Sequence, residues 1–208
     1  MSLILDTLFS ANTVTATIRV LTLLVFGTMA AVINVTSGIN NIGIEGIFLS
    51  SALVAVLGSW LTQSWILGML LAVLWGVALS LLFGYLTMKL GTNNILCGLA
   101  LNMFASGGTV FVLSAVTGQK GSSISLASKV APRFSIPLLK EIPYIKVLFT
   151  DYSFFTYLAI AVVIFVVIMI KRTPIGLRIR AVGLNPNAAS SVGINVRTVR
   201  YTAFAMSG

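Results

Sequence analysis

The chain has 208 residues, of which 58% are hydrophobic and 8% are charged. A soluble domain carries about 25% charged residues, so this composition excludes an ordinary soluble protein and predicts an all-α, polytopic membrane protein. The formal net charge of +9 does not indicate a nucleic-acid partner, because the basic residues stand in loops beside apolar runs, where they orient a membrane protein and meet anionic lipid. Without histidine and with Cys97 as the single cysteine, we expect neither a metal site nor a disulfide framework.

Five apolar runs meet or approach the roughly 20 residues that a helix needs to cross the hydrocarbon core. We predict spans over residues 18–35, 45–61, 65–88, 95–116 and 154–170. A sixth run begins near Val199 and stops at Gly208, so we expect further C-terminal spans to be missing from a single transmembrane domain over 1–208. The alternative is that residues 199–208 form a short interfacial tail.

The positions of lysine and arginine orient these spans, because cytoplasmic loops carry the excess of both residues. Lys89 marks the turn between the third and fourth spans, and a second group surrounds the segment after residue 170. This group comprises Lys171, Arg172, Arg178, Arg180, Arg197 and Arg200. With both placed in the cytoplasm, alternation makes 118–152 an extracytoplasmic loop and puts the N-terminal end outside, against which Arg19 argues.

The run from 34 to 46, NVTSGINNIGIEG, contains three glycines and three asparagines between two apolar stretches. It predicts an interrupted helix, and discontinuous membrane helices are where transport sites are often built. Glu45 has two interpretations: a carboxylate favoured in the first helical turn by the helix dipole, or a functional charge inside the membrane. We favour the first, with Asn40 and Asn41 satisfying loose backbone N–H groups.

A second polar group lies in GTNNILCGLALN, residues 91–102. Asn94 and Asn102 are eight residues apart with Gly98 midway, so all three fall near one helical face. Such a face packs against a neighbouring helix or lines a pathway, and packing is the default. If these interrupted or polar segments contact a transported substrate, the candidate pathway residues are Asn41, Glu45, Asn94 and Asn102.

A polar, basic segment, TPIGLRIRAVGLNPNAASSVG, separates the fifth span from the sixth run. Asn185 suits an N-cap, Pro186 the first helical position and Gly193 a left-handed stop. The residues between them are mostly small and let another surface approach closely. The pattern predicts a short docking helix held outside the membrane.

Three segments together resemble the permease subunits of bacterial ABC importers for nucleosides and simple sugars, within the wider group that includes branched-chain amino-acid permeases. They are residues 37–49, 91–102 and 176–194. The resemblance implies a multi-pass protein of the bacterial inner membrane, in which 173–197 is a cytoplasmic coupling loop whose short helix sits in a groove of an ATPase. Family members usually carry an acidic residue where Leu184 stands here.

The partners that the resemblance implies are a cytoplasmic ATPase, a second permease subunit, an extracytoplasmic solute-binding lipoprotein and membrane lipid. ATP and Mg would bind the ATPase, and this chain would hold no cofactor and catalyse nothing, since it lacks a GxxxxGK[ST] phosphate loop. Alternatives are a branched-chain amino-acid permease, an ion-coupled carrier or channel using Glu45, and a membrane scaffold. Candidate ATPase-coupling residues are Arg178, Arg180, Asn185, Pro186, Ala188, Ala189 and Gly193.

Overall fold

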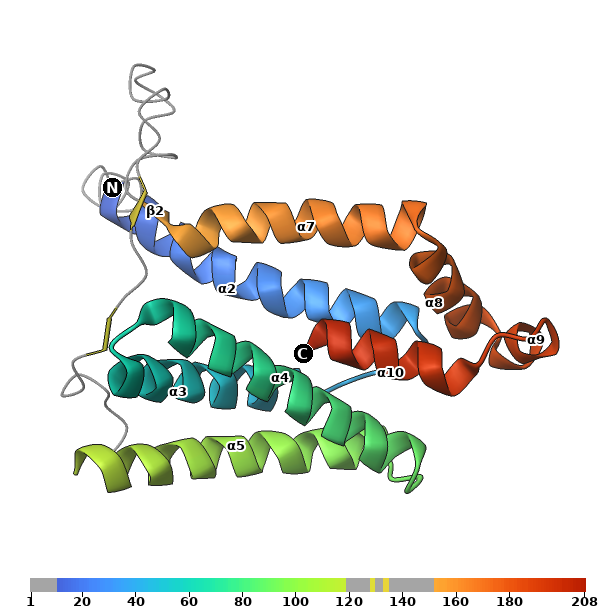
Figure 1. Cartoon of the computed structure of the whole chain (residues 1–208), viewed down its shortest axis with the longest axis horizontal. Coiled ribbons are helices and arrows are strands. Elements are labelled where there is room, and N and C mark those ends of the chain that lie inside the picture. Colours follow the sequence, from blue (N-terminus) through green and yellow to red (C-terminus); the bar gives the residue numbers. More distant parts are fainter. Residues whose placement is uncertain (1–10, 119–127, 130–132, 135–151) are drawn as a thin grey trace, which may run out of the picture. The chain divides into compact units, whose positions relative to one another are not determined.

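The computed structural model of the chain describes residues 11–118, 128–129, 133–134 and 152–208 (Figure 1). Apart from two two-residue strands, its regular elements are helices, which confirms the all-α prediction. The helices are α2 (Ala11–Thr36), α3 (Ile44–Thr62), α4 (Trp65–Met88), α5 (Asn94–Thr117), α7 (Phe154–Arg172), α8 (Pro174–Leu184), α9 (Pro186–Ser191) and α10 (Val196–Ser207). Of these, α2, α3, α4, α5 and α7 are long and apolar enough to cross a membrane.

The five predicted spans therefore correspond to five observed helices, whose ends differ by at most two residues except that α2 begins seven residues earlier, at Ala11. The predicted interruption is confirmed, because α2 ends at Thr36, α3 begins at Ile44 and residues 37–43 between them are not helical. The sixth run is part of α10, which begins at Val196. Most of the predicted extracytoplasmic loop, 118–152, lies outside the described residues.

The described residues form two compact units, and the boundary between the units falls within both α2 and α7. The first contains residues 11–28, 133–134 and 152–165. Within it, the Thr22 hydroxyl donates to the Thr156 hydroxyl oxygen at 3.3 Å. Strand β1 (Arg133–Phe134) pairs antiparallel with β2 (Tyr152–Ser153).

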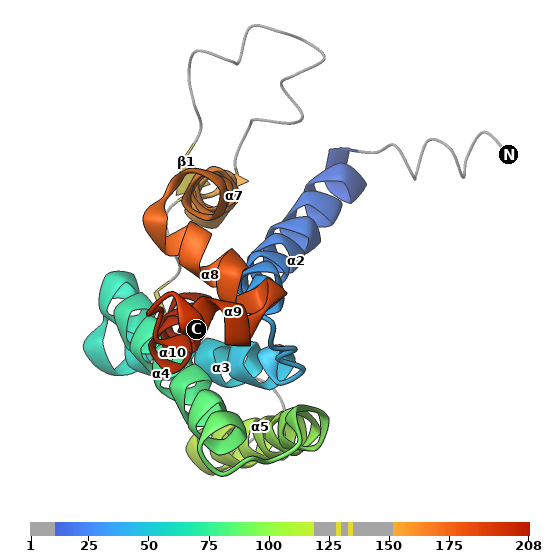
Figure 2. The same ribbon diagram turned by 90° about the vertical axis from the view of Figure 1, so that its right-hand side faces the viewer.

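The second unit contains residues 29–118, 128–129 and 166–208, and α3 lies at its centre, packed against both α4 and α5 (Figures 1 and 2). Small residues make these contacts close. A Cβ added at Gly68 of α4 would lie 2.8 Å from the backbone nitrogen of Ser59 in α3. Gln63, with a left-handed φ of 51°, ends α3 and reverses the chain into α4.

Helix α10 packs along another side of α4, where α4 presents Ser80, Phe83 and Gly84. The Ser80 hydroxyl donates to the Phe204 carbonyl oxygen at 2.6 Å. The rings of Phe83 and Phe204 meet edge to face with centroids 5.7 Å apart, and both side chains are buried. Gly84 leaves room for this ring, because a Cβ there would lie 2.7 Å from it. The last apolar run is thus part of the core.

Candidate functional site

Helix α9 has the capping pattern that the sequence predicts. The Asn185 side-chain oxygen accepts hydrogen bonds from the backbone N–H groups of Asn187 and Ala188, both at 3.1 Å. Pro186 is the first helical residue, and Gly193 follows the helix with a left-handed φ of 82°. Donors that a short helix leaves orphaned at its start are therefore satisfied by its own N-cap, which fixes where α9 begins.

Helix α8, which precedes α9, was missed in the sequence. The Thr173 hydroxyl caps it by accepting from the Gly176 N–H at 3.2 Å, and Pro174 occupies its first turn. Near its other end, Gly183 lies directly against the Thr36 carbonyl and the Gly38 backbone, so that even a methyl group would overlap them. The Thr-Pro pair was the available signal. The close approach at Gly183 ties α8 to the end of α2.

The predicted coupling residues differ in exposure. Arg178, Arg180 and Ala188 are exposed, and each is free to contact a second protein. Ala189 is only 4% exposed and packs inward, so it belongs to the support of α9 and not to its outer surface. Two large apolar side chains flank α9 in the open: Leu184, 88% exposed, and Val192, 75% exposed.

Two of the predicted pathway residues, Asn41 and Asn102, form hydrogen bonds with backbone groups at the start of α3. The Asn102 side-chain oxygen in α5 accepts from the Gly46 N–H at 2.7 Å, and its amide donates to the Ile42 carbonyl at 3.1 Å. Asn41, which is buried, accepts from the Gly43 N–H at 3.0 Å. The residue at the N-cap, Gly43, has no side chain, so α3 is capped from another helix. Asn102 thus acts as a packing residue here.

The other two pathway candidates lie elsewhere. Glu45 is in the first turn of α3, where the dipole favours a carboxylate, and its side chain is exposed. No hydrogen bond or ion pair joins it to another described residue. Asn94, half-buried, lines a cavity beside α9 and α10. Gly98 packs against Gly43, so only part of the predicted Asn94, Gly98 and Asn102 face contacts α3.

A separate cavity of about 300 Å³ lies between α3 and α5, and none of the four pathway candidates lines it. Its walls are mainly apolar, with two hydroxyl groups. The lining residues are Leu49, Ala52, Leu53, Val56, Ser106, Thr109, Val110 and Leu113. Over the described ranges, no three His, Cys, Asp or Glu side chains lie close enough together to hold a metal ion.

The sequence is similar to known transport permeases over nearly its whole length. The family described as "Branched-chain amino acid transport system / permease component" matches residues 13–208. The nucleoside ABC transporter permease protein NupC of Lactococcus lactis is 35% identical over 193 residues, covering 89% of this chain and 60% of that protein. The guanosine ABC transporter permease protein NupQ of Bacillus subtilis is 33% identical over 196 residues, with the same coverage.

A more distant relative is the putative glucose ABC transporter permease protein TsgC13 of Haloferax volcanii, 27% identical over 96% of this chain and 60% of that protein. The chain spans 60% of the length of each of these curated relatives. No solved structure matches it.

Proposed function

We propose that this chain, which belongs to the family of branched-chain amino acid transport system permease components, is the membrane subunit of an ATP-driven importer of nucleosides. The observation that carries the proposal is α9: a capped six-residue helix held between α8 and α10, with exposed Ala188 on its surface and exposed Leu184 and Val192 beside it. A contiguous exposed apolar patch with a polar rim is typical of a surface that another protein covers, and we take α9 with Leu184 and Val192 as such a surface.

In the proposed mechanism, α9 transmits the movement of the ATPase to the membrane helices. A cytoplasmic ATPase would bind α9 and, on closing around ATP and Mg, would displace it together with α8 and α10. Because α8 touches the end of α2 through Gly183, and α10 is packed on α4, this displacement would tilt helices that span the membrane. Arg178 and Arg180 are exposed and would pair with acidic groups of the ATPase. The chain itself would hydrolyse nothing.

Nucleosides are the proposed cargo because two relatives, 35% and 33% identical, have names that state nucleoside and guanosine transport. A glucose permease is 27% identical, and the family description refers to branched-chain amino acids. A second permease subunit would complete the pathway, and an extracytoplasmic solute-binding lipoprotein would deliver the nucleoside. The assembly would lie in the bacterial inner membrane.

Coupling can be tested by co-purification of the chain with its ATPase. Ala188→Arg places a bulky charge on the exposed face of α9, whereas Leu90→Arg places the same charge at an exposed position in the turn between α4 and α5. We expect Ala188→Arg to abolish ATPase capture and uptake, and Leu90→Arg to preserve both. Equal capture by the two variants would disprove the role of α9.

Cargo and energy source are tested in proteoliposomes that contain the complete importer. Labelled guanosine should enter only with ATP, and unlabelled nucleosides should compete while glucose and leucine should not. Uptake that continues without ATP and stops with an ionophore would instead identify an ion-coupled carrier. Competition by leucine alone would assign the chain to amino-acid transport.

A further inference from the structure

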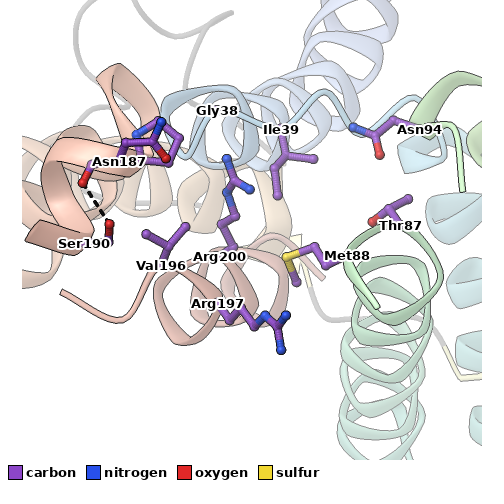
Figure 3. Close-up of a pocket in the computed structure, with 11 residues that line it drawn as sticks. Gly38, Ile39, Thr87, Met88, Asn94, Asn187, Ser190, Val196, Arg197 and Arg200 are labelled. Atoms are coloured by element: carbon purple, nitrogen blue, oxygen red, sulfur yellow. Dashed lines mark hydrogen bonds between the residues drawn. The ribbon is translucent and has the colours of Figure 1, made fainter. Parts of the chain in front are cut away.

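A cavity of about 470 Å³ lies where the segment after α2, the end of α4, the start of α5, α9 and α10 come together (Figure 3). All its lining residues belong to the second compact unit. A volume of this size is within the range of small-molecule sites. The polar side chains in its wall are mainly those of Asn94, Asn187, Arg197 and Arg200.

The charge in this cavity is unbalanced. Two arginines line it, and no acidic residue does. Glu45, the one acidic residue within the described ranges, is at the start of α3 and is not part of the wall. The Nε atom of Arg200 is buried and has no hydrogen-bond partner among the described residues. A buried guanidinium donor without an acceptor is costly, so an acceptor from outside these residues is expected.

The side chains also differ in how they face the cavity. In Figure 3, Arg200 extends toward Gly38, between Asn187 and Ile39, while Arg197 extends in another direction, below Met88. Ser190 donates its hydroxyl proton to the Asn187 carbonyl at 2.8 Å, so this hydroxyl is already engaged. The donors that remain are the guanidinium groups and the amides of Asn94 and Asn187. The ligand that complements this set accepts several hydrogen bonds and carries negative charge.

We propose that this cavity binds a phosphate group, with Arg200 as the main ligand and Arg197 as a second cation at its edge. Guanidinium matches phosphate geometry through paired N–H donors. On the predicted orientation the cavity opens near the cytoplasmic membrane surface, where two sources supply such a group: the headgroup of an anionic phospholipid and a soluble phosphate monoester. Binding here would hold α9 and α10 against the start of α5.

The test uses the purified full chain in phosphatidylcholine nanodiscs, without ATPase, binding protein or transport substrate. Its outcome therefore does not depend on whether the chain is an importer subunit. In one arm, inorganic phosphate and AMP are titrated calorimetrically. In the other, phosphatidylglycerol is added to the nanodiscs and the rise in the thermal midpoint of unfolding is measured. Binding in one arm identifies the source.

Arg200→Gln is the main variant, Arg197→Gln the second, and Arg172→Gln, at the exposed end of α7, the matched control for general attraction to anions. Loss of the charge-assisted bonds of Arg200 should weaken binding by about tenfold. Arg197→Gln should weaken it by about threefold, and the control should leave it unchanged. If Arg200→Gln fails to fold by circular dichroism, Arg197→Gln decides. No binding in either arm, or equal losses in the control, would overturn the proposal.

Discussion

The cap that Asn102 provides to α3 gives the sharpest structural prediction. Replacing it in Asn102→Leu removes two hydrogen bonds, one to the Gly46 N–H in α3 and one to the Ile42 carbonyl in the segment before α3. Such side-chain bonds between membrane helices contribute about 0.6 kcal/mol each. The Gly46 N–H would also be left without a partner, at about 1–3 kcal/mol. We therefore expect the free energy of unfolding to fall by roughly 2–4 kcal/mol.

The measurement is equilibrium unfolding in micelles by titration with a denaturing detergent, followed by far-ultraviolet circular dichroism. Asn93→Ala is the matched control, because Asn93 caps α5 through the Ile95 N–H but is exposed and joins no second helix. That variant should lose only about 1 kcal/mol. If Asn102→Leu is no less stable than Asn93→Ala, the cap from α5 does not stabilise α3 and the reasoning is wrong.

Three further predictions concern the packing around α8, α9 and α10. Gly183→Ala should lower the thermal midpoint, because its methyl group overlaps the last carbonyl of α2, whereas Gly107→Ala, with open space around it, should be neutral or stabilising; equal effects would contradict the close contact. Phe204→Ala should cost about 3–5 kcal/mol by emptying a buried ring site, and a loss below 1 kcal/mol would contradict its core position. Asn185→Ala should speed amide hydrogen exchange within α9 by about fivefold, corresponding to a lost cap of ~1 kcal/mol, and unchanged exchange would show that the cap is unimportant.

The membrane helices were predictable because each is set by a property of the local sequence. The run 65–88 is continuous and apolar, and α4 has the same ends, since lipid favours an unbroken helix in which all backbone groups are paired. The pattern at Asn185 and Pro186 likewise specifies a helix start through one side chain and one ring. The break between α2 and α3 was predictable as well, because the glycines and asparagines of 34–46 locally disfavour a continuous helix.

What remained hidden depends on contacts between distant residues. Asn94 and Asn102 share a helical face by spacing, yet one lines a cavity with Arg200 and the other caps α3, because α3 starts beside the second residue only. Spacing also could not distinguish exposed Ala188 from buried Ala189, which depends on how α9 is seated. Such distinctions depend on how the helices pack against one another, which the local sequence pattern does not specify.

Both proposals involve α9. The coupling role concerns its exposed surface, and the phosphate site concerns the cavity that α9 and α10 line. Helix α9 has only six residues, so its own hydrogen bonds are too few to hold it rigid. Its rigidity must come from α8, fixed to α2 at Gly183, and from α10, fixed to α4 at Ser80 and Phe204. The cavity around Arg200 lies inside this connection, between α10 and the start of α5. A phosphate bound there would stiffen the support of α9, because it would supply an acceptor for the buried Nε of Arg200.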